Sequence, residues 1–205
     1  MAVLKPADTR ERILESGMDV FAEHGFRGAS SREIGKRAEV NQALVNYHFG
    51  SKQKLWEAVC TECGARVLRV VQSSVRIPAV PEEVVDDVVG GLFDAFVRDA
   101  RPPRILTWAV LQADAMDFEG TAQTFQPLID LCHQYVDNVQ AGGRYVNLDL
   151  KILLGLFQGM LVFQIVDQPG HRWSFGKDFT DPDHAQRVKS QLLQAARLLL
   201  LGGNP

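Results

Sequence analysis

Two amide side chains, Gln42 and Asn46, lie four residues apart in a short segment that favours a helix. On a helix this spacing places both on one face, with Ala43 beside them. Val45 and Phe49, also four apart, share a different face, which we expect to pack inward. Glutamine and asparagine amides pair with adenine in a bidentate manner, and an alanine methyl group can contact the methyl group of thymine. The pattern predicts a surface that reads base edges in duplex DNA.

Donors suited to phosphate lie close to this face. Tyr47, His48 and Lys52 follow where such a helix would leave the groove, and they can donate hydrogen bonds to phosphate oxygens. Arg32, from the helix before, can reach guanine or phosphate. Phosphate contacts fix the register of a protein on DNA without reading its sequence. The two sets of residues therefore have complementary roles.

Short helices are expected to hold these residues in place. Ser30 and Glu33 form a capping box that begins one helix, and Asn41 is a favourable N-cap for a second helix over 42–49. With a longer helix that precedes them and ends at Gly25, they make three helices. The spacing predicts a helix-turn-helix module, in which the last helix enters the major groove of DNA.

The stretch from Arg10 to Val59 resembles the tetracycline-repressor (TetR) family of bacterial regulators. The phrases TRERILESGMDVFAEHGF, SSREIGKRAEV and ALVNYHFGSKQKLWEAV carry the resemblance, and YHFGSK is highly specific. It implies a DNA-binding regulator that works as a two-fold dimer. The resemblance implies contacts with bases or the nearby DNA backbone for Ser31, Arg32, Gln42, Ala43 and Asn46. It implies contacts with phosphates for Tyr47, His48 and Lys52. Asn41 completes the expected DNA-binding set.

Three residues depart from the family pattern. Gly35 stands where alanine is frequent, and Glu39 occupies a turn position where glycine is common. A left-handed backbone at Glu39 would cost about 1–2 kcal/mol, and a glycine inside a helix costs about 1 kcal/mol relative to alanine. Asn46 replaces a common aromatic residue, which exchanges a shape-filling contact for a hydrogen-bonding one and favours adenine.

Apolar residues recur at helical spacing throughout, without strand-like alternation, so we predict an all-α fold of about nine helices. Residues 1–55 are expected to form the helix-turn-helix DNA-binding domain. Residues 56–205 are expected to form a larger helical domain for effector binding and dimerisation. We expect helices over 103–117, 121–139, 148–166 and 182–201, and a long loop over 167–180.

Charge is distributed unevenly along the 205 residues. Residues 1–55 hold 9 Lys/Arg against 7 Asp/Glu, while the remainder holds 13 against 18, giving the overall charge of -3. The positive end suits a polyanion. The start of the chain has no signal-like apolar run, and the apolar stretch 152–166 is too short for a membrane span. We therefore expect a cytoplasmic protein that has no membrane partner, metal or cofactor.

Two apolar helices near the end of the chain suggest a homodimer. Residues 150–166 are apolar nearly all round, and Gly155 and Gly159 would let another helix approach closely. The last helix, 182–201, carries a similar excess of apolar residues. We expect these last two helices of each subunit to form a four-helix interface, which implies a palindromic operator.

Aromatic and polarizable residues between these two regions could line a pocket for a small apolar or aromatic effector. The candidates are Trp108, Met116, Phe125, His133 and Phe157. The pocket rests mainly on the family resemblance, and ordinary core packing is the alternative for each residue. In the leading hypothesis, an effector moves the helix that follows 42–49 and releases a repressor from DNA.

Two other functions stay open. Cys60 and Cys63 form a C-x-x-C pair that could sense oxidants, although a zinc site would lack ligands. Asp130, His133 and Asp137 could share a helix face and act in acid–base catalysis. The chain has no nucleophile elbow, phosphate loop or paired metal motif, so we expect it not to be an enzyme.

Overall fold

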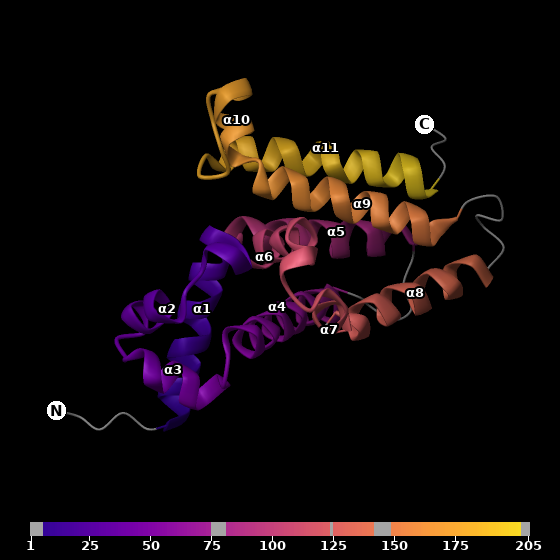
Figure 1. Ribbon diagram of the computed structural model, residues 1–205. Coiled ribbons are helices and arrows are strands. Elements are labelled where there is room, and N and C mark those ends of the chain that lie inside the picture. The colour runs from indigo at the N-terminus through magenta and orange to yellow at the C-terminus, as the bar shows by residue number, and fades with distance from the viewer. Residues whose placement is uncertain (1–5, 75–80, 124, 142–148, 202–205) are drawn as a thin grey trace. The chain divides into compact units, whose positions relative to one another are not determined.

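The computed structural model describes residues 6–74, 81–123, 125–141 and 149–201 (Figure 1). These residues form helices and no strands, which confirms the all-α class. None of the helices in these ranges is long and apolar enough to cross a membrane. The helices are α1 (Pro6–Gly28), α2 (Ser31–Arg37), α3 (Gln42–Phe49), α4 (Lys52–Ser74), α5 (Pro81–Arg98), α6 (Arg101–Leu111), the 3-10 helix η1 (Ala113–Ala115), α7 (Phe118–Gln123), α8 (Gln126–Ala141), α9 (Leu150–Val166), α10 (Gln168–Phe175) and α11 (Pro182–Leu201).

Eleven α-helices occur in the described part of the chain, two more than the nine expected. The segment 121–139, expected as one helix, is divided between α7 and α8. Pro127 explains the break, because it lies in the first turn of α8. There its missing N–H costs nothing, whereas inside a continuous helix it would remove a hydrogen bond.

The expectation of a continuous loop over 167–180 is wrong, because α10 occupies much of it. The Asp167 carboxylate accepts a hydrogen bond from the Gly170 N–H at 3.0 Å and caps the first turn. Pro169 lies in that turn, and Gly176 ends the helix in the left-handed conformation. A proline and a glycine in succession resemble a helix breaker, but a proline in the first turn is well tolerated.

The chain divides into two compact units. The first unit comprises Met1–Ala65 and Arg101–Gln126, and the second comprises Arg66–Ala100 and Pro127–Pro205. Helix α4 contributes to both units, and the first takes in α6, η1 and α7 besides the three N-terminal helices. The sequence-based boundary between residues 55 and 56 stays a prediction.

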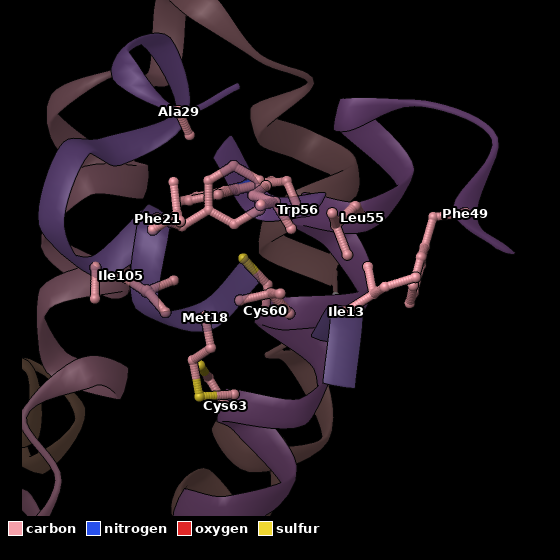
Figure 2. Packing of buried hydrophobic residues seen from close by; sticks show 14 of the residues in the cluster. Ile13, Met18, Phe21, Ala29, Phe49, Leu55, Trp56, Cys60, Cys63 and Ile105 are labelled. Carbon is pink, nitrogen blue, oxygen red and sulfur yellow. The ribbon is translucent and has the colours of Figure 1, made fainter. Parts of the chain in front are cut away.

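The core of the first unit joins α1, α4 and α6 (Figure 2). Phe21 of α1 meets the Trp56 ring of α4 edge-on, with ring centroids 5.0 Å apart. The Trp56 indole N–H donates to the hydroxyl oxygen of Thr121 at 3.2 Å, and Ile105 of α6 is fully buried. Because α4 begins three residues after α3 ends, this core fixes the base of the helix-turn-helix segment.

The core of the second unit lies among α5, α9 and α11, of which α9 and α11 lie side by side (Figure 1). Phe93 of α5 and Ile165 of α9 are almost completely buried in this core. An ion pair between the Lys189 ammonium and the Asp94 carboxylate, 2.6 Å apart, joins α11 to α5. One side of α9 is thereby packed inside its own unit.

A buried histidine pair fastens α10 to its neighbours in the second unit. His171 Nδ1 lies 3.0 Å from His184 Nε2 of α11, and His171 Nε2 lies 3.1 Å from Gln164 Oε1 of α9. If His171 Nε2–H donates to the Gln164 oxygen, His171 Nδ1 accepts from His184 Nε2–H. Both ring nitrogens of His171 then have a hydrogen-bond partner.

Acid should therefore destabilise the protein through this pair. Burial is the main cause that lowers the pKa of His171, the neighbouring His184 lowers it further, and Asp167 opposes the shift. The unfolded chain takes up a proton near pH 6.5 that the folded chain does not, so unfolding becomes easier as pH falls below that value. The expected slope is at most about 1.4 kcal/mol per pH unit from this residue.

Urea unfolding at pH 7.5 and pH 5.5 measures this effect. The His171→Gln variant should lose stability at both pH values, but it should lose most of this pH dependence. His24→Gln is the control, because His24 is exposed. A slope that is the same in His171→Gln as in the wild type would exclude the buried pair as its source.

Candidate nucleic-acid interface

Caps and apolar contacts define α2 and α3 as the sequence predicts. The Ser30 hydroxyl accepts a hydrogen bond from the Glu33 N–H at 3.2 Å, and the Asn41 side chain accepts one from the Leu44 N–H at 2.9 Å. Val45 and Phe49 of α3 are 2% and 7% exposed, which confirms that they face inward. Both helices are thereby held to the core of the first unit.

The turn between α2 and α3 explains two of the departures from the family pattern. Glu39 has a φ of 53°, so it adopts the left-handed conformation that glycine would adopt without strain. Arg12 of α1 stabilises this turn by donating to the carbonyl oxygen of Ala38 and the carboxylate of Glu39. A Cβ atom at Gly35 would lie 3.0 Å from the Val40 carbonyl oxygen, so glycine allows the turn to pack closely on α2.

The outward face of α3 carries neutral polar side chains. Gln42, Ala43 and Asn46 are exposed, and Tyr47 is 80% exposed. Because Val45 and Phe49 anchor the opposite face, these side chains project away from the core. The helix can therefore present two amide groups, a methyl group and a phenol to a partner without rearranging its own packing.

The other residues of the expected DNA-binding set have varied surroundings. Arg32 and Asn41 are exposed, although the Asn41 side chain is engaged as the N-cap of α3. Ser31 and His48 are half-buried, and the His48 ring lies edge-on to Tyr47 with centroids 5.2 Å apart. The contacts of these residues with DNA stay predictions.

Lys52 turns toward α1. Its ammonium donates to the carbonyl oxygens of Phe26 at 2.9 Å and Ala29 at 3.2 Å, and it lies 4.5 Å from the centroid of the Phe26 ring. The first residue of α4 thus caps the end of α1, as cations commonly do at helix C-termini. A lysine ammonium has three donors, so one stays available after these two bonds.

Arg10 is a candidate phosphate contact that the sequence analysis did not single out. Its side chain is exposed, and its guanidinium carbon lies 4.8 Å from the centroid of the Phe49 ring at the end of α3. The stacking places a cation beside the proposed DNA-facing helix. Arg10 and Phe49 are far apart in sequence, so no local spacing could have revealed this contact.

Arg37 of α2 has a different role from Arg32. Two of its guanidinium nitrogens donate to the two carboxylate oxygens of Glu23, at 2.7 and 2.6 Å, and one also reaches Glu33 at 3.2 Å. The hydrogen bond and charge of Arg37 lower the pKa of Glu23 below its ordinary value. Arg37 therefore joins α2 to α1 and is engaged with carboxylates.

The expected effector residues fall into both units. Trp108, Met116 and Phe125 are partly buried and pack against the core of the first unit, whereas Phe157 is buried in the core of the second. His133 is half-buried on α8. The Trp108 indole N–H donates to the carbonyl oxygen of Ala22 at 3.2 Å, so its polar atom is already engaged.

The two cysteines of the C-x-x-C pair are buried in the core of the first unit, as Figure 2 shows. Burial, followed by the neighbouring Cys63 and Glu57, raises the pKa of the Cys60 thiol well above its usual value. A thiol that stays protonated and shielded from solvent reacts slowly with oxidants. These features disfavour redox sensing.

Two of the residues considered for acid–base catalysis are surface carboxylates. Asp130 and Asp137 are exposed on α8, and the Asp137 carboxylate pairs with the Lys151 ammonium of α9 at 3.0 Å. Over the described ranges, no three histidine, cysteine or acidic side chains are placed to hold a metal ion. The exposed face of α3 is the better candidate site.

Residues 13–59, which include α2, α3 and most of the core that supports them, match the family model of bacterial regulatory proteins, tetR family. This N-terminal segment of the chain is of the TetR type. The resemblance noted in the sequence is thus confirmed, and the relatives named below are transcriptional regulators.

Two curated relatives illustrate the extent of the similarity. The HTH-type transcriptional repressor AcnR of Corynebacterium efficiens is 36% identical over 70 residues, which cover 34% of this chain and 37% of that protein. The chain thus matches only a little over a third of AcnR. The HTH-type transcriptional regulator SrpR of Pseudomonas putida is 24% identical over 161 residues, covering 75% of this chain and 72% of that protein.

The fold of the whole chain also matches solved structures. A TetR-like transcriptional regulator from Rhodococcus sp. RHA1 superposes with a TM-score of 0.70 at 19% identity. The superposition covers 98% of this chain and 100% of the other. At this identity the match establishes the TetR-like fold.

Proposed function

We propose that this chain is a TetR-family transcriptional repressor that inserts α3 into the major groove of operator DNA. The outward face of α3 carries the proposal, because Gln42 and Asn46 are exposed while Val45 and Phe49 hold the opposite face in the core. Each amide can form a bidentate pair with adenine, and Ala43 can contact a thymine methyl group. The name of the relative AcnR supports repression over activation.

Phosphate contacts would set the orientation of α3 on the duplex. Tyr47 and His48 lie at the end of α3, and the remaining donor of the Lys52 ammonium can reach a phosphate oxygen. Arg32 of α2 and Arg10 of α1 add exposed cations. We therefore expect binding to weaken steeply as salt concentration rises.

A homodimer would present two copies of α3 to one duplex. Helix α9 has an exposed apolar face made by Ile152, Leu156, Met160 and Phe163, which we call the α9 face. A Cβ atom built at Gly159 would meet nothing within 4 Å, so this part of the helix is open to a close neighbour. An apolar row of this kind is typical of a subunit interface. A second copy, paired through α9 and α11 about a two-fold axis, would impose a palindromic operator.

A small apolar or aromatic molecule would act as the effector. Met116, Phe125, His133 and Phe157 stay predicted contact residues for it. An effector that favours one conformation of α4 would change the spacing of the two α3 helices and release the DNA. Such a repressor would act in the cytoplasm.

Selection of duplexes from a randomised library, followed by fluorescence titration of the enriched sequence, tests the proposal. We expect a palindromic sequence with adenine in each half-site. We also expect the affinity to fall steeply between about 50 and 200 mM salt, as it does for proteins that contact several phosphates. Absence of any enriched sequence would overturn it. An enriched sequence that binds equally well at both salt concentrations would contradict the proposed phosphate contacts.

A further inference from the structure

Helix α1 is kinked close to the helix-turn-helix segment. Gly25 has φ 67° and ψ -175°, a conformation outside the helical region that only glycine adopts readily. A kink interrupts the regular backbone hydrogen bonds, so neighbouring N–H and carbonyl groups need other partners. Two of these partners are side chains from elsewhere in the first unit.

Helix α6 and the residue after it supply those partners. The Trp108 indole N–H donates to the carbonyl oxygen of Ala22 before the kink, and the Gln112 side-chain oxygen accepts from the Arg27 N–H after it, at 3.2 and 2.9 Å. A Cβ atom at Gly25 would lie only 2.8 Å from the Trp108 ring and 2.9 Å from the Gln112 amide. The two side chains thus bond to the α1 backbone before and after Gly25 and pack closely against it.

The same short stretch of α1 is also held from α4. Lys52 donates to the carbonyl oxygens of Phe26 and Ala29, and Ala29 is followed at once by Ser30, the N-cap of α2. A shift of the kinked end of α1 would therefore shift the start of α2 and the Lys52 ammonium. Lys52 lies three residues after the end of α3, so both helices of the helix-turn-helix would be affected.

We infer that Trp108 and Gln112 are positioning residues for DNA binding. They fix the position of the helix-turn-helix segment through their hydrogen bonds to the α1 backbone on either side of the kink. This inference rests on the proposed function of α3 and adds a means of regulating it. A displacement of α6 would break two hydrogen bonds to the α1 backbone and move the α1–α2 corner. Trp108 would then transmit the effector signal, rather than contact the effector as the sequence suggested.

Two conservative substitutions separate the hydrogen bonds from packing. Trp108→Phe keeps an aromatic ring and removes the N–H donor, and Gln112→Met keeps the approximate length and removes the acceptor. In the double variant we expect exchange of the Arg27 amide hydrogen to accelerate at least tenfold. We also expect affinity for the selected operator to fall about tenfold, while affinity for non-specific duplex DNA is nearly unchanged.

Matched variants show whether the effect is specific to the kink. Trp56→Phe removes a comparable indole hydrogen bond in the same unit, to Thr121, and should leave the exchange of the Arg27 amide hydrogen unchanged. Gln112→Glu retains an acceptor and should preserve slow exchange. Equal losses of specific and non-specific binding, or similar Arg27 exchange in Trp56→Phe and the double variant, would overturn the inference.

The exchange measurement does not require DNA. If the wild type selects no operator, the proposed function fails, and Arg27 exchange still decides whether α6 holds the kink. If the wild type binds its operator but the double variant has unaltered Arg27 exchange and affinity, the positioning role fails and the proposed function stands.

Discussion

Replacing both Gln42 and Asn46 with alanine is expected to weaken binding to the selected operator by at least about 30-fold. A bidentate amide–adenine pair contributes about 1–3 kcal/mol of discrimination, so two such pairs contribute at least about 2 kcal/mol. Both side chains are exposed, and alanine is a good helix former, so the folded structure should tolerate the change. Fluorescence titration with the operator and with a scrambled duplex measures the loss and its specificity.

The same substitutions elsewhere provide the control. Gln72 of α4 and Gln134 of α8 are also exposed glutamines on helices, and both lie in the second unit. Their double alanine variant should bind the operator with the affinity of the wild type. Wild-type affinity in the Gln42→Ala, Asn46→Ala variant would show that α3 does not read the bases. An equal loss on operator and scrambled duplex would assign the two amides to backbone contacts.

A charge in the middle of the α9 face is expected to separate the subunits. Leu156 is 62% exposed in the single chain, so Leu156→Asp should change the free energy of unfolding of a monomer by no more than about 0.5 kcal/mol. In a two-fold interface the change places two unpaired carboxylates in an apolar contact, which costs several kcal/mol. We expect the dissociation constant of the dimer to rise at least about 100-fold, because each 1.4 kcal/mol is a factor of ten.

Sedimentation equilibrium and thermal unfolding measure the two quantities separately. Gln158→Asp is the matched control: Gln158 is also exposed on α9, two residues from Leu156, which at helical spacing lies on nearly the opposite side. It should leave the dimer intact. An undiminished dimer in Leu156→Asp would exclude the α9 face as the interface, and a monomeric wild type would exclude the proposed homodimer.

Local signals in the sequence were sufficient for the helix-turn-helix segment. The caps at Ser30 and Asn41 act over three residues, and Val45 and Phe49 are related by one helical turn. Interactions of this range depend on neighbours in the chain, so the types and spacing of the residues predict them. The buried face of α3, and hence its outward face, followed from these residues alone.

Contacts between distant segments were not predictable in the same way. Lys52 could be recognised as a cation near α3, but its bonds to Phe26 and Ala29 depend on how α4 passes the end of α1. Trp108 was recognised as an aromatic residue, whereas its hydrogen bond to Ala22 joins residues 86 positions apart. Such pairs arise from tertiary packing, which periodicity does not describe.

The turn between α2 and α3 keeps its backbone conformation through contacts of its own. Glu39 adopts a left-handed backbone although it is not glycine, and Arg12 holds the turn through the Ala38 carbonyl oxygen and the Glu39 carboxylate. The outward side chains of α3 take no part in this arrangement. Evolution, or a protein engineer, could therefore exchange Gln42, Ala43 and Asn46 for other side chains and retarget the protein to new promoters while its folding is preserved.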